Sequence, residues 1–364
     1  MLLEFPAHPR AGGEYWKPAF VLPILFFGLL AALGAPASAQ TSAADVAQYQ
    51  GPDREQRLID GARREGGLVL YTSFSTSDLG AFVGPFEKQY GIKVTPWRSS
   101  SENVLQRAVA EARAGRHEVD AFETNGPELE ALHREQVLQA VESPHFAGLI
   151  PHAVPPHREW ATTRFNLFVA AYNTNLVKQD DLPKSWADLA HPRWKGKLGI
   201  EAYDHDWFAG VVSGLGEVQG LKLFREIVAA NGMSVRKGHT MLSNLVVSGE
   251  VPLALTVYYY RPVQLKKKGA PIDWFALEPA VARPNGVAIA RRARHPHAAV
   301  LFHDFMLSEA QEIMVKRNFI PASARILATL RDVPQFTVID PEVVLDEGEK
   351  WMKLYDEIIV KQAR

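Results

Sequence analysis

Apolar runs of strand length alternate with runs of helical spacing along most of the chain. The segments Leu68–Tyr71, Ile92–Trp97 and Val119–Phe122 have the length and composition of buried strands. Between the first two, apolar residues from Leu79 to Tyr90 recur at helical spacing, and Val104–Ala112 repeats the pattern before the third. Strands that alternate with helices predict a largely parallel sheet covered by helices.

The same alternation resumes after a short connecting stretch. The apolar segment Leu167–Tyr172 is followed by a polar turn and by a second apolar segment, Leu198–Ile200. The run Pro252–Val257 predicts another strand, and the chain is expected to cross back near Gly286–Ala290. A mature chain of about 325 residues is long enough for two ordinary domains. We therefore predict an α/β protein with two lobes, each a central, mostly parallel sheet flanked by helices.

The first 39 residues have the features of an export signal. Arg10 and Lys17 precede the apolar run Ala19–Leu33, and the small residues Ala37-Ser38-Ala39 provide a cleavage site before Gln40. An uncleaved anchor and a start codon downstream of Met1 remain as alternatives. The sequence has no cysteine, which excludes a lipid-modified N-terminus and disulfide bonds. These features predict residues 1–39 as a signal peptide and a periplasmic location.

Charge and motif content narrow the functional classes. The 40 basic and 41 acidic residues nearly balance and form no basic block, which argues against a nucleic-acid partner. The segment Gly210-Val-Val-Ser213-Gly lacks the spacing of a nucleophile elbow, and no zinc-protease, P-loop or dinucleotide motif is present. The sequence therefore predicts a protein that is not an enzyme.

Candidate binding residues follow the carboxyl ends of the predicted strands, where ligands bind in open parallel sheets. Ser75 with Asp78 and Ser99 with Glu102 fit a helix-capping pattern that also presents free N–H groups to anions. The alternatives are that these serines only cap helices, that the aspartates are caps or surface groups, and that Trp207 packs on its own sheet. The candidates are Thr72, Ser73, Ser75, Arg98, Ser99, Ser100, Asn125, Asp204, Asp206, Trp207, Tyr258, Tyr259 and Tyr260.

The stretch Asn166–Glu201 contains the pattern YNTNLV...DLP.SWADL..P.WKGKLGIE. This pattern resembles the extracellular solute-binding proteins of bacterial ABC importers, in particular the branch of periplasmic ferric-iron-binding proteins, and the similarity runs from about Gly67 to Arg325. The resemblance implies the type II periplasmic-binding-protein fold with a two-strand hinge near residues 168–173 and 286–290. Lobe 1 would comprise residues 66–168 plus 286–325, and lobe 2 residues 173–285 plus 330–364.

The resemblance also implies a function. A monomer would capture a solute between its lobes and deliver it to an ABC importer permease in the inner membrane, without a cofactor of its own. A secreted enzyme and a periplasmic sensor partner are the alternatives. In the iron-binding branch an adjacent tyrosine pair supplies phenolate ligands, so Tyr259 and Tyr260 are the metal candidates if the solute is Fe(III).

This chain departs from the iron-binding pattern in its first lobe. Those proteins often add a His and a Glu there, and the loop after Leu68–Tyr71 has neither. The ligand therefore stays open between ferric iron, a small anionic or zwitterionic solute such as a phosphonate, and an amine or polyamine held by cation–π contacts.

Overall fold

The computed structural model describes residues 42–362, so the predicted signal peptide lies outside the described residues. The described residues form one compact unit. Within residues 42–362, no helix combines the length and the apolar character needed to cross a membrane.

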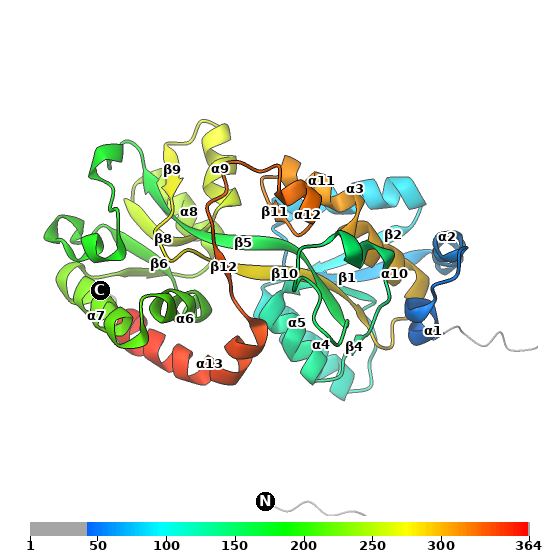
Figure 1. Ribbon diagram of the computed structural model, residues 1–364. Helices are drawn as coiled ribbons and strands as arrows, with labels where there is room; N and C mark the ends of the chain where they lie inside the picture. Colours follow the sequence, from blue (N-terminus) through cyan, green and yellow to red (C-terminus); the bar gives the residue numbers. More distant parts are fainter. Residues whose placement is uncertain (1–41, 363–364) are drawn as a thin grey trace, which may run out of the picture. The chain divides into compact units, whose positions relative to one another are not determined.

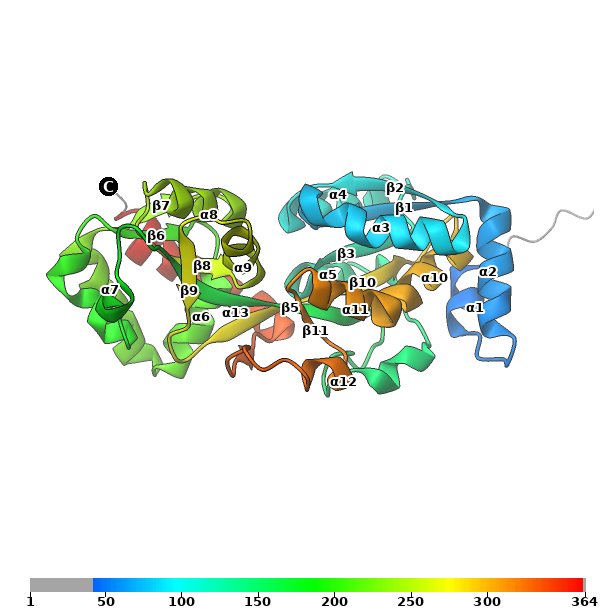
Figure 2. The same ribbon diagram turned by 90° about the horizontal axis from the view of Figure 1, so that it is seen from above.

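The first group of strands confirms the predicted alternation. β1 (Gly67–Thr72) pairs in parallel with β2 (Lys93–Arg98) and with β3 (Ala121–Asn125), and β10 (Val281–Ala290) runs antiparallel beside β3. A helix follows each of the three parallel strands, as a right-handed parallel crossover requires. These helices are α3 (Thr76–Tyr90), α4 (Ser101–Arg113) and α5 (Gly126–Arg134). Two further helices, α2 (Arg54–Glu65) and α10 (Pro296–Leu307), pack on each other beside this group (Figures 1 and 2).

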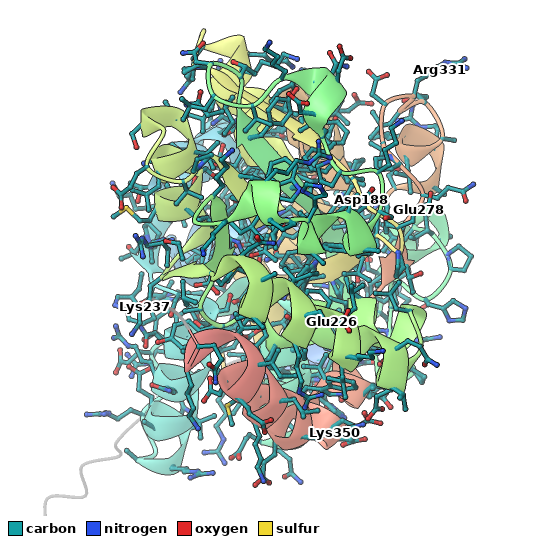
Figure 3. All side chains as sticks on the ribbon, turned by 90° about the vertical axis from the view of Figure 1, so that its left-hand side faces the viewer. Asp188, Glu226, Lys237, Glu278, Arg331 and Lys350 are labelled. Carbon is teal, nitrogen blue, oxygen red and sulfur yellow. The ribbon has the colours of Figure 1, made fainter. Side chains whose placement is uncertain are left out.

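The second group repeats the arrangement on a smaller scale. β6 (Leu198–Glu201) lies between β7 (Ser234–Arg236) and β8 (Leu253–Tyr258), parallel to both. Its helices are α6 (His205–Gly214), α7 (Glu217–Asn231), α8 (His239–Ser248) and α9 (Tyr260–Lys267). Helix α13 (Pro341–Tyr355) packs on α6 and also contacts α5 of the first group. Charged residues such as Glu226 and Lys350 cover the exposed side of α7 and α13 (Figure 3).

Two long strands join the groups. β5 (Trp160–Asn173) pairs antiparallel with β10 through residues 160–167 and with β8 through residues 168–172, so it belongs to both sheets (Figure 1). β9 (Ile272–Phe275) and β12 (Thr337–Val338) add short pairings with β5 and β10. Residues 286–289 of β10 lie beside β3 in the first sheet. The position at which the lobes bend stays a prediction.

Several short elements complete the described chain. They are α1 (Ala43–Gln48), β4 (Leu138–Gln139), α11 (Glu309–Lys316), β11 (Ile320–Pro321), α12 (Ala324–Leu327), the 3-10 helices Pro144–Gly148, Gln179–Asp181, Trp186–Ala190 and Pro192–Trp194, and the π-helix Asp356–Val360. Ser185 is the N-cap of the 3-10 helix Trp186–Ala190 and forms a reciprocal capping box with Asp188.

The strand boundaries correct the sequence analysis at three places. β3 extends to Asn125, β5 begins at Trp160, and β10 begins at Val281. In each case the missed part carries polar side chains, which interrupt the apolar run, and β10 also contains Pro284. A register shift between Asn285 and Gly286 accommodates the irregular strand.

Candidate functional site

Polar side chains form a continuous row on one face of the joined sheets. Neighbouring strands place Thr72 beside Glu123, Asn125 beside Asn285, Asn285 beside Arg164, Asn166 beside Arg283, and Phe168 beside Tyr258. Because side chains alternate along a strand, each of these partners projects from the same face. We call this row the polar stripe; it consists of Thr72, Glu123, Asn125, Arg164, Asn166, Tyr258, Arg283 and Asn285.

At one end of the stripe an arginine is held against a carboxylate. Arg164 of β5 donates from Nη1 to Glu123 of β3, and Glu123 also accepts a 2.6 Å hydrogen bond from the hydroxyl of Thr72. The guanidinium carbon lies 4.0 Å from the ring centroid of Phe74 and 5.0 Å from that of Phe319. Arg164 is therefore a buried cation that contacts two neighbouring aromatic rings, and its Nε has no hydrogen-bond partner.

Three asparagines occupy the middle of the stripe. The side-chain amides of Asn166 and Asn285 both donate to Oδ1 of Asn125, at 3.4 and 3.2 Å. All three residues are buried, and the side-chain oxygens of Asn166 and Asn285 have no partner. Buried polar atoms are normally satisfied, so these oxygens can accept hydrogen bonds from a bound molecule.

At the other end, Arg283 of β10 gathers the groups of the second sheet. It donates to Asp206 from Nε at 2.5 Å and again from Nη2, to Asp204 at 3.3 Å, and to the phenol of Tyr258 at 2.6 Å. Burial opposes its charge, but Asp206 and Tyr258 outweigh that effect and hold the pKa of Arg283 well above its usual value. Burial raises the pKa of Tyr258 despite the nearby guanidinium, so Tyr258 is a neutral phenol.

His239 is a second basic group beside Asp204. Its Nε2 lies 3.3 Å from Asp204 Oδ1, and its Nδ1 lies 3.2 Å from the backbone oxygen of Thr256. Burial lowers the pKa of His239, but the charge of Asp204 outweighs this, and the net shift is upward. Burial alone would raise the pKa of Asp204. His239 and Arg283 outweigh this effect and lower the pKa, so the carboxylate stays ionised. The aspartates are thus neutralised by the protein itself.

The predicted first-lobe residues fall into two groups, those in the polar stripe and those at the loop after β1. Thr72 and Asn125 belong to the stripe. Ser73, Ser75 and Arg98 lie on or beside the loop after β1: the backbone N–H of Ser73 donates to the Glu123 carbonyl at 2.9 Å, and Arg98 Nε donates to the Phe74 carbonyl at 2.9 Å. The hydroxyl of Ser75, the N-cap residue of α3, donates to Asp78 at 2.5 Å.

The predicted capping box at Ser99 and Glu102 is wrong. Helix α4 begins at Ser101, and its N-cap is Ser100, whose oxygen accepts the backbone N–H of Asn103 at 3.4 Å. The hydroxyl of Ser99 accepts a hydrogen bond from the Asn103 side chain at 3.0 Å. Three consecutive serines made the helix start ambiguous by one residue in the sequence.

The aromatic candidates of the second lobe have different surroundings. Trp207 is fully buried, with its ring 5.5 Å from Trp186 and 5.7 Å from Phe224, and so it packs in the second core. The Tyr259 ring lies 4.8 Å from Trp274, whereas the Tyr260 ring lies 4.4 Å from Phe319 of the first lobe. Burial raises the pKa of Tyr259, and it raises the pKa of Tyr260 to about 12.

Two clusters of described residues have the composition of metal sites. In the first, Glu130, His133 and His157, the imidazole rings stack at 3.7 Å and 10°. Lone pairs in parallel ring planes point side by side instead of toward one point, and His157 Nε2 already lies 3.1 Å from Glu130 within the cluster. In the second, Glu201, Asp204 and His239, the carboxylate of Glu201 accepts the backbone N–H groups of Tyr203 and Gly238. The Glu201 carboxylate therefore stabilises the backbone at Tyr203 and Gly238.

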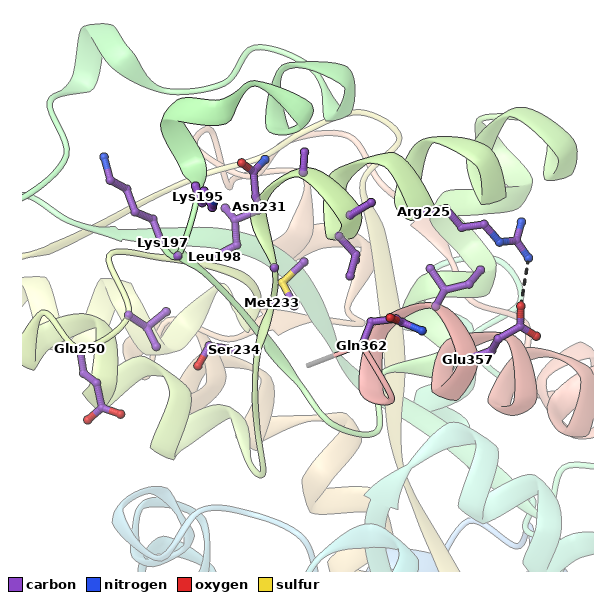
Figure 4. Close-up of a pocket in the computed structure, with 17 residues that line it drawn as sticks. Lys195, Lys197, Leu198, Arg225, Asn231, Met233, Ser234, Glu250, Glu357 and Gln362 are labelled. Carbon is purple, nitrogen blue, oxygen red and sulfur yellow. Dashed lines mark ion pairs between the residues drawn. The ribbon is translucent and has the colours of Figure 1, made fainter. Parts of the chain in front are cut away.

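Elsewhere, a hollow of about 600 Å³ lies between the end of α7 and the C-terminal turns (Figure 4). Its wall includes Lys197, Met233, Glu250 and the ion pair of Arg225 with Glu357 at 3.5 Å. It contains no residue of the polar stripe, so it is a separate surface feature.

The sequence candidates do not include five residues of the stripe: Glu123, Arg164, Asn166, Arg283 and Asn285. The signal that could have revealed them is period-two polarity inside apolar strands, as in Arg164-Phe-Asn166-Leu-Phe168.

Comparison with known proteins identifies the family. Residues 125–340, more than half of the chain, match the family model described as "Bacterial extracellular solute-binding protein". The chain belongs to this family. Its members bind solutes for transport and are not enzymes, which confirms the prediction of a non-enzymatic protein.

Individual relatives agree with this assignment. The Fe(3+)-binding periplasmic protein of Serratia marcescens is 27% identical over 210 residues, which are 57% of this chain and 62% of that protein. Iron-bound HitA from Pseudomonas aeruginosa has a TM-score of 0.68 at 22% identity, covering 80% of this chain and 99% of that one. AfuA from Actinobacillus pleuropneumoniae, with exogenous fructose-6-phosphate bound, has a TM-score of 0.68 at 20% identity, over 81% and 99%. These structures confirm the two-lobed type II fold of the solute-binding protein.

Proposed function

We propose that this solute-binding protein captures a small polar solute between its two lobes in the periplasm and delivers it to an ABC importer permease. The observation that supports this most directly is the polar stripe, which runs from the first sheet across β5 and β10 to Tyr258 of the second. A row of buried polar groups on the strands shared by two lobes is suited to hold a solute that both lobes contact.

The proposal includes the division into lobes. Lobe 1 consists of residues 66–168 plus 286–325, and lobe 2 of residues 173–285 plus 330–364, with bending near 168–173 and 286–290. A ligand that contacts both lobes favours the closed form by its differential affinity. The first-lobe candidates around Thr72 and Asn125 and the second-lobe candidates around Tyr258 would then meet across the ligand.

Small-angle scattering and thermal unfolding test the proposal together. A solute that raises the melting temperature of the purified mature protein should also reduce its radius of gyration, and the scattering mass should be that of a monomer. A ligand that stabilises the protein at saturation without any change in radius would contradict the closure. N-terminal sequencing of the periplasmic fraction should find a mature chain that begins at Gln40.

Ferric iron is the second candidate ligand, because the names of the relatives describe iron-binding and iron-uptake proteins. In that case Tyr259 and Tyr260 would supply phenolates, and iron would have to displace their protons against raised pKa values. Loading with ferric citrate should then colour the protein, and Tyr259→Phe or Tyr260→Phe should bleach it while Tyr172→Phe does not. A colourless, iron-free protein by elemental analysis would exclude this ligand.

A further inference from the structure

Three neighbouring residues of the polar stripe carry buried atoms without a hydrogen-bond partner. They are Nε of Arg164, Oδ1 of Asn166 and Oδ1 of Asn285. Asn285 lies directly beside Arg164 on the adjacent strand, and Asn166 lies two residues further along β5 on the same face. All three side chains are at least 95% buried. The unpartnered atoms therefore lie within one small region, a few Å across, at the centre of the stripe.

The chemistry of these atoms is mixed. Arg164 offers a cationic N–H donor, whereas the two amide oxygens are acceptors. The guanidinium is bonded to Glu123 through Nη1, so Nε remains for a ligand oxygen. The Arg283 guanidinium, by contrast, donates from all three of its nitrogens to Asp204, Asp206 and Tyr258. Arg164 is therefore the arginine of the stripe that can receive an anionic group.

Each simple class of ligand can form hydrogen bonds with only some of these three unpartnered atoms. A bare ferric ion could approach the amide oxygens, but it would be repelled by Arg164. An anion without donors could bind Arg164 but would leave both amide oxygens buried and unpaired, which is unfavourable. An alkylamine could donate to the amide oxygens but would leave Arg164 without an anionic partner. A molecule that carries an anionic oxygen group and an ammonium group a few Å apart satisfies all three atoms.

We infer that the solute is a small zwitterion, whose carboxylate or phosphonate oxygen accepts from Arg164 and whose ammonium donates to Asn166 and Asn285. The rings of Phe74 and Phe319 both contact Arg164 and surround it with apolar groups, where a charge-assisted hydrogen bond is stronger than in water. This inference rests on the proposed function, because it names the solute for the same stripe.

A ligand panel on the mature protein tests the inference. The probes are the common amino acids and aminoalkylphosphonates, the matching carboxylates and phosphonates without the amine, the matching alkylamines, and ferric citrate. We expect at least one zwitterion to raise the melting temperature. Its analogue without the amine and its analogue without the anionic group should each bind at least tenfold more weakly by calorimetry. Tighter binding of ferric citrate, or of either analogue, would overturn the inference and leave the solute-binding function standing. Binding by no probe would overturn both.

Variants then locate the contact. Arg164→Lys keeps the charge but loses Nε, and Asn166→Ala removes an acceptor without touching an ion pair. Both should weaken binding of the zwitterion at least tenfold, while Arg107→Lys, in α4 and outside the stripe, leaves it unchanged. Unchanged affinity in Asn166→Ala, with a native melting temperature, would overturn the assignment even if Arg164→Lys failed to fold.

Discussion

Removing the guanidinium of Arg283 should strongly destabilise the protein. Arg283 is buried and donates to Asp204, Asp206 and Tyr258. In Arg283→Met the two aspartates remain buried without their cation. Breaking a buried pair in this way costs about 3 to 5 kcal/mol, because the remaining charge is left uncompensated.

The magnitude can be checked by thermal and denaturant unfolding. For a mature chain of about 325 residues, a loss of 3 to 5 kcal/mol corresponds to a fall in melting temperature of roughly 4 to 7 °C. The matched control is Arg113→Met, since the ion pair of Arg113 with Glu135 is exposed and such pairs contribute at most about 1 kcal/mol. Adding Asp206→Asn to Arg283→Met should restore part of the stability.

The pH dependence provides an independent check. The pKa of Asp204 is lowered in the folded protein, so its contribution is present above the ordinary value of 3.8 and is lost as the pH falls through the lower folded value. Arg283 helps to lower the pKa of Asp204, so without Arg283 this buried carboxylate binds its proton at higher pH. The difference between wild type and Arg283→Met should therefore shrink as the solution is acidified from pH 7 toward pH 4. A loss no larger than that of Arg113→Met, or a difference independent of pH, would refute the reasoning.

Three further predictions concern single residues. Burial, aided by Glu102, raises the pKa of Glu128 from 4.5 to about 8, so the stability of the wild type should fall as the pH rises toward 8 and level off above it, whereas that of Glu128→Gln should not; melting temperatures from pH 6 to 9.5 that run parallel would contradict this. Gly126→Ala should lose about 1 to 3 kcal/mol, because a Cβ there would lie 2.7 Å from Pro284, whereas Gly84→Ala in α3 meets nothing and should gain a few tenths of a kcal/mol or more. Trp207→Ala should lose about 3 to 5 kcal/mol in denaturant unfolding while calorimetry finds the solute affinity retained; a selective loss of affinity would instead make Trp207 a ligand contact.

The fold could be predicted because its evidence is local. Apolar runs such as Leu68–Tyr71 and helical spacings such as Leu79–Tyr90 are set by neighbouring residues, and each appears in the structure within a few positions. Ser185 caps the 3-10 helix that follows it for the same reason. Alternation of these elements then restricts the topology to an α/β arrangement.

The stripe could be predicted only in part, because its partners are distant in sequence. Asp206 accepts a hydrogen bond from Arg283, 77 positions away, and no residue adjacent to either one in the sequence indicates this pairing. Polar residues also displaced the predicted strand boundaries: β3 was ended too early and β5 was begun too late, so Glu123 and Arg164 were left outside the predicted strands. The side chains that make the site are those that interrupt the apolar pattern by which strands are found.

The position of the stripe relates binding to bending. The pairing of β5 with β10 changes register between Asn285 and Gly286, next to Arg164 on the partner strand. A ladder is least regular at such a shift, and this one adjoins the segment of β10, residues 286–290, where we expect the lobes to bend. A ligand that bonds Arg164 of β5 together with Asn285 of β10 would hold the two strands across this irregular point. It would thereby restrict the motion that separates the lobes, and the preference for the closed form would arise at the centre of the stripe.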